Sequence, residues 1–267
     1  MTQQPPVRVG EVHVEQAGAG DPVVFLHAGI ADTRMWEPQW HTWASRFHLI
    51  GIDRRGYGRS DAPHGTHAHA ADVVAVLDAL GLDRVAVVGA SFGGLVALDL
   101  AAAHPERVAR LALAAPALPD QEWSGEMRAY HDEEERLWEA GELDGATELN
   151  VRFWLPGAAP AVQAAIREQQ RLAFAKEGDA ESVFLTEDIP AALDTISAPT
   201  LVVVGARDKA DFWAIAERVA SAIPGARLAV VDEASHLPSL ERPEAFEQEV
   251  LPFLLAQNGL AGGGGRM

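Results

Sequence analysis

Short apolar runs alternate with longer amphipathic runs along this chain, and this alternation limits the possible folds more than any other feature. Several of the short runs are apolar at nearly every position, which is the pattern of strands that are covered on both faces. The expected strands cover residues 7–14, 23–27, 49–53, 85–89, 111–115, 200–205 and 228–231, and the expected helices cover residues 69–80, 92–104, 212–223 and 243–257. The sequence therefore predicts an α/β fold with a mostly parallel, twisted sheet and helices on both faces.

Two parts of the chain depart from this alternation. Residues 7–14 are followed by a turn-like stretch at 18–22, so we expect antiparallel strands at one edge of the sheet. Residues 118–190 contain no convincing strand, and helical stretches are expected at 126–140, 144–154 and 159–176. An insertion of this kind predicts a helical cap over one end of the sheet. The expected division is a core of residues 1–117 and 191–258, a cap of residues 118–190 and a flexible tail of residues 259–267.

Composition and charge exclude several classes of partner. The formal net charge of −18 would repel nucleic-acid phosphates and anionic lipids. No apolar run approaches the ~18 residues of a membrane span, and the first residues lack the features of a signal peptide, so a cytoplasmic location is expected. The chain has no cysteine, and the spacing of its 10 histidines fits no metal site. We expect a monomer or homodimer that uses no metal or cofactor and binds neither nucleic acid nor membrane.

A GxSxG motif at residues 89–93 lies between an expected strand and an expected helix. This is the context in which the serine, here Ser91, forms a nucleophile elbow. The serine of such a turn has a strained backbone, and side chains at Gly89 or Gly93 would collide across the turn. A helix N-cap is the alternative role for Ser91.

A serine hydroxyl becomes a useful nucleophile when a neighbouring base takes its proton. His236 follows the last expected strand and therefore lies at the carboxyl end of the sheet, as Ser91 does. Asp208 follows the expected strand 200–205 and is placed to fix the tautomer of the histidine, with Asp211 as a close rival. The sequence thus predicts a catalytic triad of Ser91, Asp208 and His236.

Acyl transfer also needs backbone N–H groups that stabilise an oxyanion. The amide of Phe92, directly after the serine, is one expected donor. The other is expected in the loop after strand 23–27, where we select Gly29, with Ile30 as its neighbour. His27 at the start of this loop is interpreted as a structural, hydrogen-bonded histidine.

These segments together resemble the α/β-hydrolase superfamily over about residues 7–257. Residues 25–29 with 35–36 resemble its oxyanion loop followed by tryptophan, and residues 53–60 resemble its D-x-R-G-x-G-x-S turn, which serves as scaffolding. Residues 205–208 and 235–236 match its acid and histidine positions, in the chain order serine, acid, histidine. Ala28 departs from the family, which usually has glycine there. The resemblance implies an α/β-hydrolase fold.

Within the superfamily, a serine at the elbow separates this chain from haloalkane dehalogenases and epoxide hydrolases, which use aspartate. The single cap is similar to that of small carboxylesterases, enol-lactonases and carbon–carbon bond hydrolases. The resemblance implies cleavage of a carboxylic ester or lactone of a small to medium apolar substrate through an acyl-enzyme. The alternatives are a carbon–carbon bond hydrolase, perhydrolase or lyase on the same triad, or a receptor-like binding protein with low turnover.

The cap is rich in large apolar side chains, some of which are expected to face the substrate. Packing within the cap is the alternative role for each of them. The candidate substrate-binding residues are Ile30, Trp123, Trp138, Trp154 and Leu237.

Overall fold

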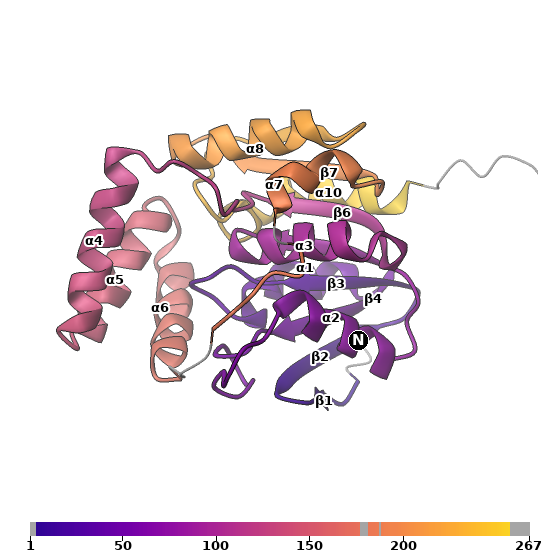
Figure 1. Ribbon diagram of the computed structural model, residues 1–267, viewed down its shortest axis with the longest axis horizontal. Coiled ribbons are helices and arrows are strands. Elements are labelled where there is room, and N and C mark those ends of the chain that lie inside the picture. The colour runs from indigo at the N-terminus through magenta and orange to yellow at the C-terminus, as the bar shows by residue number, and fades with distance from the viewer. Residues whose placement is uncertain (1–3, 177–180, 187, 257–267) are drawn as a thin grey trace, which may run out of the picture.

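The protein is described here by a computed structural model, which covers residues 4–176, 181–186 and 188–256 (Figure 1). Its strands form one eight-stranded sheet in the order β1-β2-β4-β3-β5-β6-β7-β8. The strands are β1 (Val7–Val9), β2 (Val12–Gly18), β3 (Asp21–Leu26), β4 (Phe47–Asp53), β5 (Val85–Ala90), β6 (Val108–Ala114), β7 (Thr200–Gly205) and β8 (Arg227–Val231).

The sheet is antiparallel at one edge and parallel elsewhere. Strand β1 pairs antiparallel with β2, and β2 pairs antiparallel with β4, whereas every other neighbouring pair is parallel. The predicted α/β class and the antiparallel edge are both confirmed. Because the parallel strands share one direction, the carboxyl ends of β3, β5, β7 and β8 meet at the same edge of the sheet.

Helices cover both faces of the sheet (Figure 1). Helices α2 and α3 pack together on one face, and α1 and α10 pack together on the other. The central helix α3 is apolar apart from Asp99, and its residues 93–101 are all buried. The α-helices are α1 (Glu37–Trp43), α2 (His69–Ala79), α3 (Phe92–Ala103), α4 (Gly125–Glu139), α5 (Leu143–Trp154), α6 (Pro160–Phe174), α7 (Ile189–Ala192), α8 (Ala210–Ala222), α9 (Pro238–Glu241) and α10 (Pro243–Leu255), and the 3-10 helices are η1 (Thr33–Trp36), η2 (Pro105–Arg107) and η3 (Leu193–Thr195).

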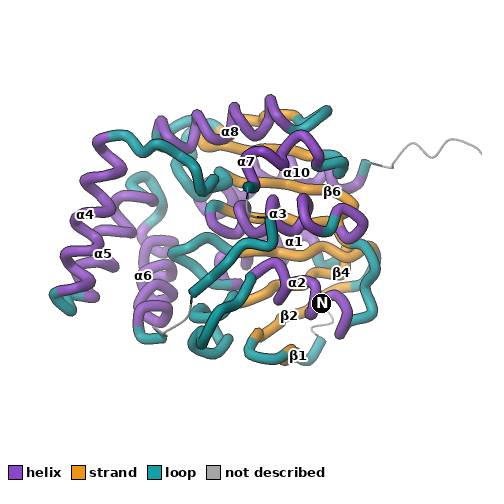
Figure 2. Tube along the Cα trace, in the orientation of Figure 1, coloured by secondary structure: helices purple, strands orange, loops and turns teal. Residues whose placement is uncertain are grey.

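Helices α4, α5 and α6 lie beside one another at one end of the sheet, away from the helices that cover its faces (Figures 1 and 2). They occupy the three predicted helical stretches of the insertion. After α6 the chain returns along the core, where one parallel bridge joins His67 to Ser182. The predicted tail, residues 259–267, lies outside the described residues.

An aromatic cluster anchors the strand that leads to the predicted oxyanion loop. The ring of Phe25 in β3 lies 5.1 Å from the ring of Trp36 and 5.6 Å from that of Trp43, measured between centroids. All three side chains are fully buried. Burying such large apolar side chains stabilises the strand and the following turn together. Among the described residues, no helix has the length and apolarity needed to cross a membrane.

Candidate active site

Ser91 occupies the turn between β5 and α3, and its backbone has the unusual dihedral angles φ 50° and ψ −116°. Positive φ is strained for a residue other than glycine. The N–H of Ser91 donates to the carbonyl oxygen of Ala114 at 2.9 Å, which ties the turn to β6. A Cβ on Gly89 would lie 2.5 Å from the carbonyl oxygen of Gly93, and one on Gly93 would collide with the carbonyls of Leu26 and His27. Both glycines are therefore required by the closeness of the backbones around this turn.

The imidazole of His236 lies between Ser91 and Asp208. Its Nε2 is 2.9 Å from Ser91 Oγ, and its Nδ1 is 3.1 Å from each carboxylate oxygen of Asp208. The side chain of His236 is 4% exposed, and that of Asp208 is fully buried. These residues follow β5, β7 and β8, so the parallel sheet brings together three segments that are far apart in the chain.

Asp211, the rival acid, has a different partner. One of its carboxylate oxygens accepts a hydrogen bond of 2.8 Å from the backbone N–H of Ser124, the residue that precedes α4. Asp208 is the acid that contacts the histidine, whereas Asp211 holds the start of helix α4.

Glu241 fixes the loop that carries His236 and is not among the site residues predicted from the sequence. Its two carboxylate oxygens accept hydrogen bonds of 3.1 Å from the backbone N–H groups of Ser235 and Leu237, on either side of the histidine. Burial raises the pKa of Glu241, and the two backbone hydrogen bonds oppose this rise. The one sequence signal is an acid in the short segment that follows the histidine.

The predicted oxyanion donors lie beside Ser91. No described residue accepts a hydrogen bond from the backbone N–H of Gly29 or Phe92, and both residues line the same cavity as Ser91. Phe92 is the first residue of α3, where the helix dipole favours negative charge. The N–H of Ala28, in contrast, donates to Met35 Sδ at 3.3 Å. Because the N–H of Ala28 has this partner, the N–H of Gly29 is the available amide of the two.

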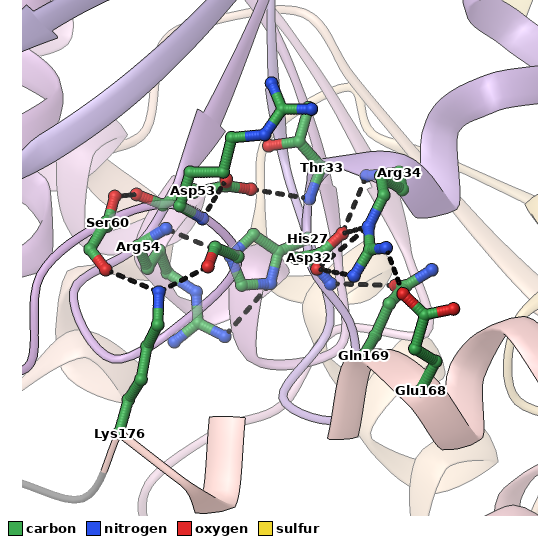
Figure 3. A network of polar contacts seen from close by, with 12 residues as sticks. His27, Asp32, Thr33, Arg34, Asp53, Arg54, Ser60, Glu168, Gln169 and Lys176 are labelled. Atoms are coloured by element: carbon green, nitrogen blue, oxygen red, sulfur yellow. Dashed lines mark hydrogen bonds and ion pairs between the residues drawn. The ribbon is translucent and has the colours of Figure 1, made fainter. Parts of the chain in front are cut away.

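His27 and the turn 53–60 form hydrogen bonds to the loop that follows β3 and carries Gly29 (Figure 3). The Nδ1–H of His27 donates to the carbonyl oxygen of Ala28 at 2.8 Å, and its Nε2 accepts from the backbone N–H of Arg54 at 3.0 Å. Burial lowers the pKa of His27 well below its usual range, and the charge of Arg54 adds to this effect. Asp53 accepts from the backbone N–H groups of Thr33 and Arg59 at 2.9 and 2.8 Å. The contacts of His27 and Asp53 hold the loop backbone in place, which is a structural role.

Helix α6 is hydrogen-bonded to the same loop (Figure 3). Gln169 Oε1 accepts a hydrogen bond of 3.0 Å from the backbone N–H of Asp32, and both residues are buried. Arg34 pairs with Asp32 at 2.8 Å and with Glu168 at 2.7 Å. The residues just after α6 are attached to the turn 53–60, because Lys176 donates to the carbonyl oxygen of Ser60 at 2.8 Å.

A cavity of about 720 Å³ opens beside Ser91 and His236, and residues of helices α4, α5 and α6 line its other side. Of the candidate substrate-binding residues, Ile30, Trp138 and Trp154 line it. The Trp154 ring lies 4.4 Å from the ring of His236, measured between centroids. The remaining lining residues are Ala28, Gly29, Tyr57, Ser91, Phe92, Tyr130, His131, Glu134, Glu135, Asn150, Gln170, Phe174 and His236.

The structure places the other two candidates elsewhere. Trp123 packs against the rings of His131 and Phe212, at centroid distances of 5.4 and 5.9 Å, and does not line the cavity. Leu237 is fully buried in the hydrophobic core, because the loop that presents His236 turns the next side chain inward. Neither Trp123 nor Leu237 lines the cavity beside Ser91.

The cavity wall also contains a polar network that is not predicted from the sequence. The Trp154 Nε1–H donates to the Tyr130 hydroxyl at 3.0 Å, the hydroxyl donates to Asn150 Oδ1, and Asn150 Nδ2 donates to Glu134 at 2.7 Å. Burial raises the pKa of the Tyr130 hydroxyl, and the charge of Glu134 raises it further. Tyr130 and Glu134 are four residues apart on α4, so their helical spacing is the one signal in the sequence.

Within the described residues, no group of three or more His, Asp or Glu side chains is arranged to hold a metal ion. The chemistry that the geometry supports is proton transfer from a serine to a histidine that a carboxylate orients, with backbone donors beside the serine. A nucleophile elbow at the carboxyl edge of a parallel sheet, with acid and histidine on later loops, defines an α/β hydrolase.

Comparison with known proteins gives the same class. Residues 23–249 match the alpha/beta hydrolase family, and the chain belongs to this family and is a hydrolase. It is 29% identical to the carboxylesterase YbfK of Bacillus subtilis over 92% of this chain and 85% of that protein. It is 30% identical to a putative carbamate hydrolase, RutD, of a Caulobacter species, over 91% of this chain and 94% of that protein. The crystal structure of an enol-lactonase from Burkholderia xenovorans superposes with a TM-score of 0.79 at 26% identity, over 94% of this chain and all of that chain.

Proposed function

We propose that this protein is a serine hydrolase that cleaves a carboxylic ester or lactone of a small to medium substrate through an acyl-enzyme. The contact between His236 and both Ser91 and Asp208 is the observation that carries the proposal. The similarity to a carboxylesterase and to an enol-lactonase supports the choice of ester and lactone bonds. A cavity of about 720 Å³ fits a ligand of this size.

Each step of the proposed mechanism uses one part of the site. Asp208 accepts from the Nδ1–H of His236, so Nε2 is the free base and takes the proton of Ser91 as Oγ attacks the carbonyl carbon. The N–H groups of Phe92 and Gly29 stabilise the oxyanion of the tetrahedral intermediate. Protonated His236 then gives its proton to the departing alkoxide. In a lactone this opens the ring, and the alcohol stays attached to the acyl group.

The acyl-enzyme is hydrolysed by the same groups in a second cycle. His236 takes a proton from water, the resulting hydroxide attacks the acyl carbon, and the proton returns to Ser91 Oγ as the acid leaves. Trp154 against the imidazole limits the access of bulk water to this side of His236. The net reaction consumes one water for each bond cleaved.

We also propose that residues 118–190 act as a cap over a core formed by 1–117 and 191–258, and that the substrate is a small molecule. The cavity between cap helices and the triad supports this division. A cytoplasmic location and a monomeric or homodimeric state stay predictions.

Turnover of 4-nitrophenyl esters from acetate to decanoate tests the proposal. We expect multiple turnovers by the wild-type protein, acid and alcohol as the only products by mass spectrometry, and no turnover above background by Ser91→Ala. The Thr42→Ala variant, which changes an exposed hydroxyl outside the cavity, serves as a control with unchanged turnover. Retention of ester cleavage by Ser91→Ala would overturn the assignment.

The alternatives give different results in the same assay. A carbon–carbon bond hydrolase or a lyase acts on bonds that these esters do not contain, so its own substrate is turned over far faster than any ester of the series. A perhydrolase forms the peracid when hydrogen peroxide is added to the assay, and a receptor-like protein binds ligand without multiple turnover.

A further inference from the structure

The peptide group between Ala28 and Gly29 is held from its carbonyl side. The carbonyl oxygen of Ala28 accepts a hydrogen bond of 2.8 Å from the Nδ1–H of His27 and one of 3.3 Å from Arg54 Nη2. No peptide bond of the described residues is cis, so the N–H of Gly29 points in the opposite direction from this carbonyl. That N–H has no partner among the described residues, and Gly29 lines the cavity. The two donors therefore hold a candidate oxyanion donor in place through one planar group.

Arg54 acts on this peptide group through both its backbone and its side chain. Its backbone N–H donates to Nε2 of His27 at 3.0 Å, which leaves the ring hydrogen on Nδ1, the atom that donates to Ala28. Figure 3 shows the guanidinium of Arg54 beside the ring of His27. Burial and the charge of Arg54 both lower the pKa of His27, so the imidazole stays neutral and keeps this pattern of one donor and one acceptor.

The guanidinium of Arg54 also contacts the residue of the second candidate donor. Its Cζ lies 4.5 Å from the centroid of the Phe92 ring and 4.4 Å from that of the Tyr57 ring. Phe92 and Tyr57 line the cavity, whereas Arg54 does not. A Cβ on Gly29 would lie 3.8 Å from Phe92 Cβ, so the two candidate donors belong to neighbouring residues. Arg54 is therefore in contact with both parts of the candidate oxyanion hole, which consists of the N–H groups of Gly29 and Phe92.

The positive charge of Arg54 is buried and has no carboxylate partner. The residue is 4% exposed. No described Asp or Glu forms an ion pair with it, whereas the next residue, Arg55, pairs with Asp72 at 2.7 Å. The carboxylate of the neighbouring Asp53 accepts hydrogen bonds from two backbone N–H groups instead. Burial lowers the pKa of Arg54, but a guanidinium keeps its proton in proteins. An unpaired buried cation is unfavourable for the fold, and a negative charge that forms nearby would offset part of this penalty.

We propose that Arg54 is a positioning residue of the oxyanion hole, and that its positive charge stabilises the oxyanion through the peptide group of Ala28 and Gly29. The inference rests on the proposed function, in which Ser91 Oγ bonds to the carbonyl carbon, its proton passes to His236, and the carbonyl oxygen becomes negative. A donor on the carbonyl side of a peptide group polarises its N–H, and a charged donor does so more strongly than a neutral one. Because Arg54 is buried, bulk water screens this charge only weakly.

Neutral replacements at position 54 test this role. Arg54→Met and Arg54→Gln both remove the charge, and because one is apolar and the other polar, the comparison stands if only one of them is folded by circular dichroism. We expect each folded variant to lower kcat for 4-nitrophenyl butyrate by about 10- to 100-fold and to leave KM within about threefold of wild type, because the oxyanion forms only in the transition state. The matched control is Arg55→Met, which removes an ion-paired guanidinium of the same turn and should keep kcat within about twofold of wild type.

A transition-state analogue separates this effect from a general loss of structure. The carbonyl carbon of 1,1,1-trifluorooctan-2-one accepts Ser91 Oγ and forms a hemiketal oxyanion, whereas the alcohol 1,1,1-trifluorooctan-2-ol binds without this charge. We expect the inhibition constant of the ketone to rise in the neutral variants by about the factor by which kcat/KM falls, and that of the alcohol to change by less than about threefold. Arg54→Lys keeps a positive charge and should retain more of the affinity for the ketone than either neutral variant.

The outcomes distinguish this inference from the proposed function. An equal rise for ketone and alcohol would mean that the loop has lost its structure. An unchanged constant for the ketone, or a lysine variant no better than the neutral ones, would mean that the charge has no effect. Each of these results overturns the role of Arg54, and the hydrolase assignment stands as long as wild-type protein cleaves esters. If wild-type protein neither cleaves esters nor binds the ketone more tightly than the alcohol, the proposed function fails, and the role of Arg54 fails with it.

Discussion

Gln169 of the cap accepts a hydrogen bond of 3.0 Å from the backbone N–H of Asp32, 137 residues earlier in the chain. Asp32 is the N-cap residue of η1 and lies two residues after Ile30. The next residue along α6, Gln170, lines the cavity. One cap helix therefore contacts both the substrate cavity and the loop that carries a candidate oxyanion donor.

Gln169→Ala is expected to lower kcat about tenfold or more while KM changes little. The buried N–H of Asp32 loses its acceptor, which costs about 1–3 kcal/mol and lets the loop shift, and an oxyanion donor acts mainly in the transition state. Steady-state kinetics with a neutral 4-nitrophenyl ester measures both constants. Gln169→Glu keeps an acceptor oxygen and should restore most of the rate.

The matched control for this positioning role is Glu168→Ala. It removes only an exposed ion pair with Arg34, of a kind worth about 0–1 kcal/mol, so its kcat should stay within about twofold of wild type. Equal losses in the two variants would argue for a general effect on α6 rather than for a hydrogen bond that positions the loop.

Asp208→Asn should reduce kcat by about four orders of magnitude, because an amide beside His236 favours the wrong tautomer. Asp211→Asn should change kcat by less than about threefold, since an asparagine oxygen can still accept from Ser124 and the residue does not contact His236. The comparison uses the same ester for both variants. The reverse order of effects would show that the acid is misassigned.

The strain at Ser91 predicts an unusual order of stability among inactive variants. At ordinary positions alanine is more stable than glycine by about 0.4–1 kcal/mol, whereas the backbone of Ser91, with φ 50°, costs a residue other than glycine about 1–3 kcal/mol. Ser91→Gly should therefore exceed Ser91→Ala in free energy of unfolding by about 1 kcal/mol in urea titrations. If the alanine variant is the more stable one, the turn is not strained.

Buried histidines make the stability of the fold sensitive to acid. Burial lowers the pKa of His69 to about 2, and the charge of Arg54 adds to this effect. In the unfolded chain the pKa is about 6.5, so between pH 6.5 and 2 the unfolded state binds a proton that the native state does not. The free energy of unfolding is unaffected by this group above pH 6.5 and falls by about 1.4 kcal/mol for each pH unit below it.

The His69→Phe variant removes this titration. We expect its loss of unfolding free energy between pH 7.5 and pH 5.0 to be about 2 kcal/mol smaller than that of the wild type, measured by urea unfolding. His41→Phe changes an exposed histidine and should keep the wild-type loss. An identical pH dependence in His69→Phe and wild type would contradict the account of this residue.

The parts of the fold that can be predicted are those that the local pattern of apolar and turn residues determines. Strands such as β7 and helices such as α3 follow from continuous apolar runs and their turn residues, and the α/β class is correct. Helix α1 (Glu37–Trp43) is not predicted, because its seven residues are too few for a periodic pattern and its packing against α10 holds it.

Within the candidate site, the residues that follow strand ends could be predicted, because the sheet determines their place. Glu241 and Gln169 could not be, since their roles depend on hydrogen bonds to backbone groups brought near by folding. The same limit applies to Trp123 and Leu237, because residue type alone does not tell which apolar side chains face the cavity and which face the core. Which amide of the 28–29 pair is free depends on the contact of Ala28 with Met35.

Labelling with a fluorophosphonate tests the central claim most directly, because this probe phosphonylates an activated serine. Intact-protein and peptide mass spectrometry after incubation should show one adduct for each chain, on Ser91, with ester cleavage lost in proportion to labelling. Asp208→Asn should be labelled far more slowly, and Ser91→Ala not at all. An adduct on another residue, or full ester cleavage by protein that is completely labelled at Ser91, would contradict the account.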